Sequence, residues 1–372
     1  MSDIHYEIRG RAGLITLNRP KALNALSLPM VRALTGVLLD WADRSEVEVV
    51  AIRGMGKDPA HPTGGAPFGA FCAGGDIRFF HQAALAGDPT LEDFFTEEYA
   101  LNHLVHEFPK PYLVFMDGIV MGGGMGIAGH GAAHALRIAT ERTKMAMPET
   151  AIGLFPDVGG GWFLARCPGR IGEYLALTGL VIDGAAALSA GLADGVVSSS
   201  DLPGLWDALA TQGTRGLANL RARAAATPDT QLAPHREAID HFFGLSDVTS
   251  IVQALEAAPG DWARETAAVL RKRSPLMLHV VLEQVRRARD MSLADDLRLE
   301  RGLVRHCFHL RPGAASETVE GIRALAVDKD HAPRWNPARI EDVTPAMVTP
   351  FFDNPWPPHA HPLRDLGEAG AL

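Results

Sequence analysis

Short strands alternate with an amphipathic helix in the first part of the chain, and this alternation restricts the fold more than any other feature. Residues 5–9 and 14–17 have the pattern of two strands joined by a glycine-flanked turn. Apolar residues recur every three or four positions over 30–41, which indicates a helix, and 47–52 is a run typical of a third strand. Because strands that alternate with helices pack in layers, the sequence predicts an α/β protein.

Elements of the same kind continue to about residue 200. Residues 91–107 have helical spacing, 112–116 are a nearly all-apolar strand, and 136–140 have the pattern of another strand. A helical stretch is expected to begin in the glycine run at 122 and to reach about residue 133. The segment between 54 and 71 is so rich in proline and glycine that we expect a surface loop without regular structure.

The character of the sequence changes near residue 200, where strand patterns give way to helical ones. The helical windows after this point are 206–210, 234–243, 248–257, 261–272, 275–289 and 293–310. We therefore expect three regions: an α/β core over 1–200, a helical C-terminal region over 201–340, and a proline-rich surface tail over 341–372.

Composition excludes several classes of protein. The chain has 372 residues and a net charge of −9, so it lacks the basic excess that binds a phosphate backbone, and we expect no nucleic-acid partner. No apolar run approaches the roughly 18–20 residues that cross a bilayer, so no membrane partner is expected either. The first ten residues do not resemble an export signal. Three widely spaced cysteines exclude a disulfide framework and indicate a reducing compartment, for which we expect the cytoplasm.

Three glycine-rich segments carry the candidate chemistry: residues 71–76, 121–126 and 147–161. The first two place backbone with few side chains just ahead of a predicted helix, where unpaired N–H groups point outward. Two such groups that converge on one oxygen form an oxyanion hole. The third segment contains Glu149 and Asp157, whose carboxylates can serve as acid or base beside it.

The three segments together resemble the crotonase, or enoyl-CoA hydratase/isomerase, superfamily. Residues 327–330 (VDKD), with Pro333 and Trp335, resemble the C-terminal signature of the 3-hydroxyisobutyryl-CoA hydrolase family, so the likeness spans nearly the whole chain. The other phrases that carry it are GLITLNRP at 13–20, FCAGGDI at 71–77, MDG at 116–118, GGG at 122–124 with His130 and Gly131, and MPETAIGLFPDVGGG at 147–161.

This resemblance implies a spiral of ββα units, followed by a helical region, that binds acyl-CoA with its thioester carbonyl between two N–H groups. These groups fall on Gly75 and Gly123. Hydratases carry one glutamate three residues past the second glycine and another in a Pro-Glu motif, but here Gly126 occupies the first position and only Glu149 remains. The hydrolases instead pair that glutamate with an aspartate, which falls on Asp157. The resemblance therefore implies thioester hydrolysis rather than hydration.

In the implied mechanism, the two N–H groups stabilise a tetrahedral oxyanion while Glu149 either attacks the carbonyl or activates water. Asp157 holds the 3-hydroxyl of the substrate or assists proton transfer to the departing thiolate. The implied substrate is a short branched 3-hydroxyacyl-CoA, as in valine breakdown. No separate cofactor is implied because CoA is part of the substrate, and no metal is expected.

Further residues are expected to bind the substrate. They are the neighbours of the oxyanion glycines, a histidine in the family's phrase, and two cations suited to the phosphates of CoA. These residues are Gly74, Asp76, Gly122, Gly126, His130, Arg19 and Lys21. Crotonases often form trimers, so a homo-oligomer is possible, although the long C-terminal region could cover that surface.

Three other interpretations stay open. A hydratase or isomerase of the same fold and a CoA-binding protein without catalysis would share the pocket. Residues 124–129 also match the dinucleotide motif G-x-G-x-x-G, but the acid about twenty residues on, Glu149, lies beyond a strand that ends near Thr140.

Overall fold

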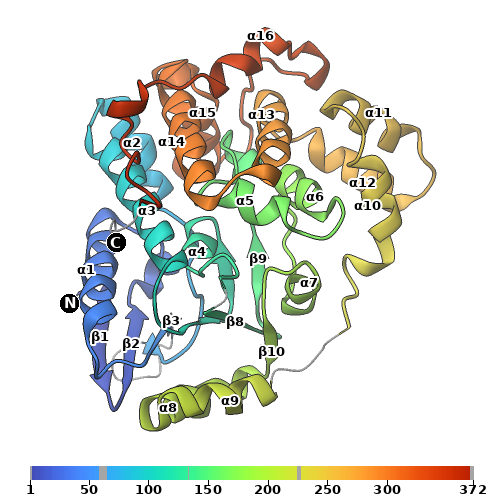
Figure 1. Ribbon diagram of the computed structural model, residues 1–372. Helices are drawn as coiled ribbons and strands as arrows, with labels where there is room; N and C mark the ends of the chain where they lie inside the picture. The colour runs from blue at the N-terminus through green and yellow to red at the C-terminus, as the bar shows by residue number, and fades with distance from the viewer. Residues whose placement is uncertain (1, 58–64, 133, 224–227, 369–372) are drawn as a thin grey trace.

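A six-stranded sheet lies at the centre of the computed structural model, which describes residues 2–57, 65–132, 134–223 and 228–368. The strand order is β1-β2-β3-β6-β8-β10, and only the β1–β2 hairpin is antiparallel (Figure 1). The predicted α/β class is confirmed, as are the opening hairpin and the three strands expected near 47–52, 112–116 and 136–140. The strands are β1 (Ile4–Arg9), β2 (Ala12–Leu17), β3 (Val49–Gly54), β6 (Tyr112–Met116), β8 (Ala135–Thr140) and β10 (Gly195–Val197).

The two faces of this sheet carry separate apolar cores. Helices α1 (Leu28–Asp43) and α3 (Thr90–His106) contribute to the first core. The ring of Trp41 lies so close to the sheet that a Cβ on Gly13 would come within 2.4 Å of it, so only glycine fits there. Helix α8 (Leu202–Gln212) covers the opposite face with Trp206 and Leu209. Side chains alternate along each strand, so strands β2, β3, β6, β8 and β10 supply both cores, whereas β1 contributes only to the first.

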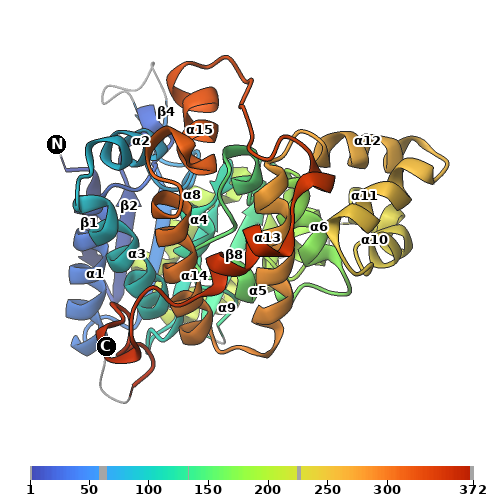
Figure 2. The ribbon, with the colours of Figure 1, turned by 90° about the horizontal axis from the view of Figure 1, so that it is seen from above.

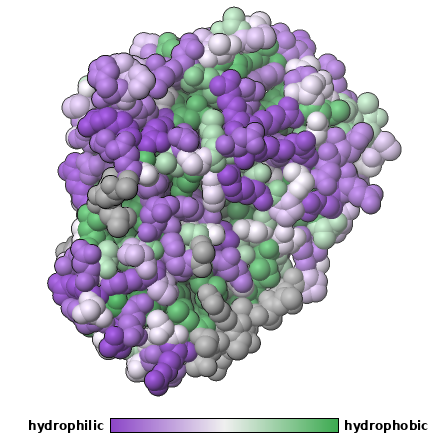
Figure 3. All heavy atoms as spheres, viewed as in Figure 1, coloured by the Kyte–Doolittle hydropathy of each residue, from purple (hydrophilic) through white to green (hydrophobic). Residues whose placement is uncertain are grey.

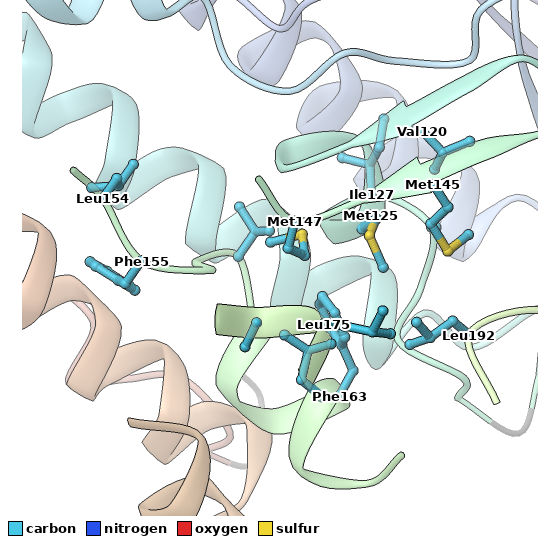
Figure 4. Close-up of a cluster of buried hydrophobic side chains, with 14 of the residues drawn as sticks. Val120, Met125, Ile127, Met145, Met147, Leu154, Phe155, Phe163, Leu175 and Leu192 are labelled. Atoms are coloured by element: carbon cyan, nitrogen blue, oxygen red, sulfur yellow. The ribbon is translucent and has the colours of Figure 1, made fainter. Parts of the chain in front are cut away.

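A smaller layer beside the main sheet positions the glycine-rich segments. Its strands β7 (Ile119–Met121) and β9 (Lys144–Ala146) run parallel, and Cys72 pairs with Val120 in the same direction. Figure 4 shows side chains of β7, β9, α5 and α6 converging in the apolar cluster next to this layer. All three parallel segments therefore end on the same side, where ligands bind in many α/β proteins.

The helices that follow residue 228 pack against the first core, and together with α8 they agree with the predicted helical windows. Figures 1 and 2 show α13, α14 and α15 beside α5, α3 and α2. The division near residue 200 stays a prediction. The remaining helices are α2 (Ile77–Ala86), α4 (Gly123–Gly126), α5 (Gly160–Ala165), α6 (Ile171–Thr178), α7 (Gly184–Ser189), α9 (Thr214–Arg223), α10 (Arg236–Phe242), α11 (Val248–Ala257), α12 (Asp261–Leu270), α13 (Pro275–Arg287), α14 (Leu293–His309), α15 (Glu317–Ile322) and α16 (Pro345–Val348).

Two local predictions were wrong. The helix expected from 122 to about 133 is the single turn α4, because the backbone enters the left-handed region at Gly129, His130 and Gly131 and cannot continue a right-handed helix. The loop expected without regular structure has a short ribbon at its base, formed by β4 (Gly56–Lys57) and β5 (Gly65–Ala66). Residues 58–64 of that loop lie outside the described residues.

The surface seen in Figure 3 is mostly hydrophilic, with apolar residues scattered between the charged ones. None of the helices in the described ranges combines the length and the apolar character needed to cross a bilayer.

Candidate active site

The parallel pairing of Cys72 with Val120 brings two glycine-rich segments side by side. The Cys72 N–H donates to the Ile119 carbonyl at 3.0 Å, and the Met121 N–H donates to the Cys72 carbonyl at 2.9 Å. Because both segments run in the same direction, the glycines that follow them emerge together. A Cβ built on Gly74 would lie 3.5 Å from the Gly123 nitrogen.

The backbone N–H groups of Gly75 and Gly123 are both available to a ligand. No residue in the described part of the chain accepts a hydrogen bond from either group. Gly122, in the left-handed region at φ +48°, makes the tight turn that precedes Gly123. Two unpaired donors next to each other are the arrangement expected of an oxyanion hole.

Glu149 stands on the neighbouring parallel segment. It follows β9 by three residues, and its Oε1 would lie 3.0 Å from a Cβ on Gly122. Its side chain is buried, and Oε2 has no partner among the described residues. Burial, and then the negative charge of Asp157, raise the pKa of Glu149 well above its ordinary value. Glu149 is thus a strongly basic carboxylate when it is ionised, and its Oε2 is free to contact a ligand.

Asp157 enters the same space from the loop between Glu149 and α5. Its Oδ2 accepts a hydrogen bond from the Tyr99 hydroxyl at 2.9 Å. Burial raises the pKa of Asp157 to about 7, although the hydrogen bond from Tyr99 lowers it. Two buried acids that repel each other do not ionise together readily, so this pair can hold a proton near neutral pH.

A third buried acid, Glu98 on α3, was missed by sequence reasoning. Its Oε1 would lie 2.5 Å from a Cβ on Gly123, so it stands directly beside the second donor segment. Burial, and then the charge of Asp157, raise the pKa of Glu98 well above its ordinary value. The sequence did offer one signal for Glu98: its carboxylate lies within the apolar helix face formed by Phe94, Phe95 and Tyr99, where an acid is unusual.

These groups surround one cavity of about 220 Å³. It has a backbone wall of glycines, an acidic wall and an apolar side. Six of the residues predicted for the site line it together. The lining residues are Ala73, Gly74, Gly75, Ile77, Phe80, Glu98, Met121, Gly122, Gly123, Pro148, Glu149, Ala151, Ile152, Leu154, Asp157 and Leu325.

Gly126 and His130, both predicted to bind substrate, lie behind the cavity rather than on its surface. A Cβ on Gly126 would come within 2.6 Å of the Val158 Cβ, so Val158 fills the space of any side chain at this position. The His130 Nε2 lies 2.7 Å from the Val158 carbonyl oxygen. Both residues therefore support the loop that carries Asp157.

Asp76, Arg19 and Lys21 are also absent from the cavity lining. The Asp76 carboxylate caps α2 by accepting from the Phe79 N–H, and it pairs with Arg19 at 3.0 Å. Lys21 is exposed. The part of Arg19 and Lys21 in binding the phosphates of CoA stays a prediction, as does the contact of Asp76 with substrate. In the part of the chain that the structure describes, no group of three or more His, Cys, Asp or Glu residues is arranged to hold a metal ion.

The chain is similar to known proteins over nearly its whole length. It matches the family model "Enoyl-CoA hydratase/isomerase" over residues 12–352. It is 39% identical to a 3-hydroxyisobutyryl-CoA hydrolase of Gallus gallus, covering 94% of this chain and 89% of the relative. The corresponding human protein is 37% identical over 94% of this chain and 88% of the relative.

Solved structures agree on the fold but carry other names. A carnitinyl-CoA dehydratase from Mycobacterium thermoresistibile is 38% identical with a TM-score of 0.83, covering 95% of this chain and 97% of that structure. An enoyl-CoA hydratase from Rhodobacter sphaeroides 2.4.1 is 37% identical with a TM-score of 0.84, covering 95% and 98%. The crotonase-like architecture implied by the sequence is therefore confirmed.

The names of the hydrolase relatives contradict the expected cytoplasmic location, because those relatives are described as mitochondrial. The expectation rested on three cysteines, all of which are free and buried. A low cysteine content argues against an oxidising compartment but does not choose among the others, so it could not support a specific location.

Two unpaired glycine amides face buried carboxylates across one cavity, and the similarity extends from the opening strands to the C-terminal helices. The chain belongs to the enoyl-CoA hydratase/isomerase (crotonase) family, and its similarity over nearly the full length places it beside the 3-hydroxyisobutyryl-CoA hydrolases.

Proposed function

We propose that this protein hydrolyses a short branched 3-hydroxyacyl-CoA thioester, of the 3-hydroxyisobutyryl-CoA type formed in valine breakdown, to the free acid and CoA. One observation carries the proposal: the free N–H groups of Gly75 and Gly123 share a cavity with Glu149 and Asp157. The names of the relatives support the choice of acyl group.

The thioester carbonyl oxygen accepts hydrogen bonds from the N–H groups of Gly75 and Gly123. Glu149 either attacks the carbonyl carbon or removes a proton from an attacking water, and the negative charge that forms on the carbonyl oxygen is stabilised by the two donors. When the tetrahedral intermediate collapses, the carbon–sulfur bond breaks, the sulfur takes up a proton from Asp157, and CoA leaves as the free thiol. An acyl-enzyme, if Glu149 attacks directly, is then hydrolysed by water.

Asp157 carries out the proton transfer that Glu149 does not. With a pKa raised to about 7, it exists in both protonation states near neutral pH and can give or take a proton. It can alternatively accept a hydrogen bond from the 3-hydroxyl of the substrate. An acyl group without that hydroxyl leaves the buried Asp157 with the Tyr99 hydroxyl but without a donor from the substrate, which disfavours its binding.

Hydration of an enoyl-CoA is the second candidate, because the solved relatives carry hydratase and dehydratase names. The packing around Gly126 argues against it. Val158 fills the space next to this glycine, so the position that carries a glutamate in hydratases has no room for a side chain here. A binding protein without catalysis is disfavoured too, because three buried acids around one cavity are destabilising and serve no purpose in simple binding.

The test is an assay of the wild-type protein with three acyl-CoA thioesters: 3-hydroxyisobutyryl-CoA, isobutyryl-CoA and the unsaturated methacrylyl-CoA. We expect release of free thiol from the first at a kcat/KM at least about 10²-fold above that for the second, which lacks the hydroxyl. Loss of the double bond of the third without thiol release would instead identify a hydratase. No reaction with any of the three would refute catalysis on these substrates.

A further inference from the structure

The loop that carries Asp157 has an unusual backbone at the next residue. Val158 has φ +57°, in the left-handed region that β-branched residues rarely adopt, and Gly159 follows with φ +84°. Two successive left-handed residues turn the chain sharply just after Asp157. Such a conformation persists only where the surroundings impose it, and it is typical of functional sites.

Two fully buried side chains from the C-terminal helices hold this turn. Glu300 on α14 accepts hydrogen bonds from the Gly159 N–H at 2.7 Å and from the Gly161 N–H at 3.0 Å. Gln284 on α13 donates to the Pro156 carbonyl at 2.7 Å and to the Glu300 carboxylate at 3.1 Å. Hydrogen bonds from these two side chains therefore hold the backbone both before and after Asp157.

Two further hydrogen bonds hold the same loop. The neutral ring of His130, whose pKa burial lowers to about 3, donates from Nε2 to the Val158 carbonyl at 2.7 Å. Asp296 accepts from the Trp162 N–H at 2.8 Å, one turn along α14 from Glu300. Residues far apart in sequence thus satisfy the backbone groups of the loop before and after the strained position.

Accepting two N–H groups with a buried carboxylate costs folding free energy, because an ionised group loses its hydration. The charge of Glu300 is also felt at the site: burial, then Asp296, and also the charge of Asp157 raise its pKa well above the ordinary value. Glu300 is absent from the cavity lining and does not reach the reacting atoms. Its contacts end on the loop whose shape decides where the Asp157 carboxylate points.

We propose that Glu300 is a positioning residue for thioester hydrolysis: by holding the N–H groups of Gly159 and Gly161, it keeps the Val158 turn and with it the Asp157 carboxylate in the catalytic cavity. This inference rests on the proposed function, since it assigns Glu300 a part in the same reaction.

A double-mutant cycle tests it on the full-length protein with 3-hydroxyisobutyryl-CoA. Glu300→Gln replaces one of the two acceptor oxygens by a donor, so one glycine amide loses its partner. We expect kcat/KM to fall about 10- to 100-fold. In an Asp157→Asn background the same substitution is expected to cause no further loss, because Glu300 acts through Asp157. An unchanged kcat/KM, or an equal loss in both backgrounds, overturns the proposal.

Glu173→Gln is the matched control, because Glu173 is an equally buried carboxylate that pairs with Arg170 and Arg289 away from the cavity. It should leave kcat/KM unchanged, and a loss equal to that of Glu300→Gln overturns the proposal. If Glu300→Gln does not fold, Gln284→Met enters the same cycle with the same expectation, since it removes the donor to Pro156.

Amide hydrogen exchange separates a failure of this inference from a failure of the proposed function. Absence of thiol release by the wild-type protein would refute the proposed function, and exchange then decides on Glu300 alone. Faster exchange at Gly159 or Gly161 in Glu300→Gln, without a change in α1, supports the positioning contact. Unchanged exchange at both glycines overturns it.

Discussion

The two walls of the cavity are built in different ways. The donor wall is backbone: the amides of Gly75 and Gly123 are placed by the pairing of Cys72 with Val120, and no side chain takes part. The acidic wall is side chain: Glu98 comes from α3, Glu149 from a 3-10 turn over Glu149–Ile152, and Asp157 from the loop before α5, and each is buried with a raised pKa.

This difference implies different weaknesses. A backbone donor survives every substitution except proline, so the donor wall is otherwise damaged only by added bulk that displaces it. An acid can be neutralised with almost no change in shape, so the acidic wall is sensitive to the loss of a single charge. The acidic wall also depends on remote residues, because its loop is held by α13 and α14.

The largest effect is expected at the acidic wall from Glu149→Gln. The amide can neither attack the thioester nor remove a proton from water, so kcat should fall about 10³-fold or more. The midpoint temperature of unfolding should be unchanged or slightly higher than in the wild type, because a buried ionisable group whose charged form is disfavoured by burial is replaced by a neutral one. A thiol-release assay measures kcat, and calorimetry measures the thermal unfolding. A kcat near that of the wild type would remove Glu149 from the mechanism.

A smaller effect is expected at the donor wall from Gly123→Ala. The new Cβ would lie 2.5 Å from the Glu98 Oε1, so the backbone or Glu98 must move. The N–H of residue 123 then no longer points at the position of the thioester oxygen. We expect kcat/KM to fall about 10²-fold. Gly36→Ala on α1 is the matched control, because a Cβ there meets nothing within 4 Å and should leave kcat/KM unchanged. Equal kinetics for the two variants would contradict the oxyanion assignment.

The two walls also differ in how far the sequence could predict them. The donor wall was predicted because its signal is local: an apolar strand, a glycine run and a helix start follow one another directly. Glu149 and Asp157 were singled out as carboxylates of the third glycine-rich segment, and the resemblance to a family gave them their roles. Glu98 was not, since its role depends on where α3 lies against Gly123, and that contact joins residues remote in sequence. The hydrogen bonds from the loop to Glu300 join residues that are still farther apart in sequence.

Local patterns also misled where backbone strain decides the structure. The segment after Gly123 reads as a helix, but His130 adopts φ +50° and the helix ends after one turn. The compensation comes from the contact of its ring with the Val158 carbonyl, which no local pattern records. Asp76 was expected to contact substrate because of its place next to Gly75; the structure shows its carboxylate capping α2 outside the cavity lining, and a substrate contact stays a prediction.

Stability measurements sharpen the contrast, because only the acidic wall should oppose folding. The pKa of Asp157 is raised from 3.8 to about 7, so between these values the folded state binds the proton more tightly than the unfolded state. The free energy of unfolding therefore falls as pH rises from about 4 to 7. Asp157→Asn should remove this loss and raise the free energy of unfolding by about 1 to 2 kcal/mol at pH 8. A less stable Asp157→Asn protein at pH 8 would contradict the burial penalty.

The smallest effect concerns the hydrogen bond that Tyr99 donates to Asp157. This bond stabilises the ionised form and lowers the pKa of Asp157, so Tyr99→Phe should raise that pKa above its value of about 7. The limb of the pH profile of kcat/KM that reports Asp157 should move to higher pH by roughly one unit or less. The direction is the same whether Asp157 acts as acid or as base.

Tyr174→Phe is the matched control for this experiment. Tyr174 is also buried, but it packs against Phe243 and Trp262 away from the cavity. Its loss should leave the pH profile in place. A limb that stays fixed in Tyr99→Phe, or moves to lower pH, would mean that the ionisation of Asp157 does not govern turnover. The acidic wall would then act through Glu149 and Glu98 alone, and the raised pKa of Asp157 would be a consequence of burial without a part in catalysis.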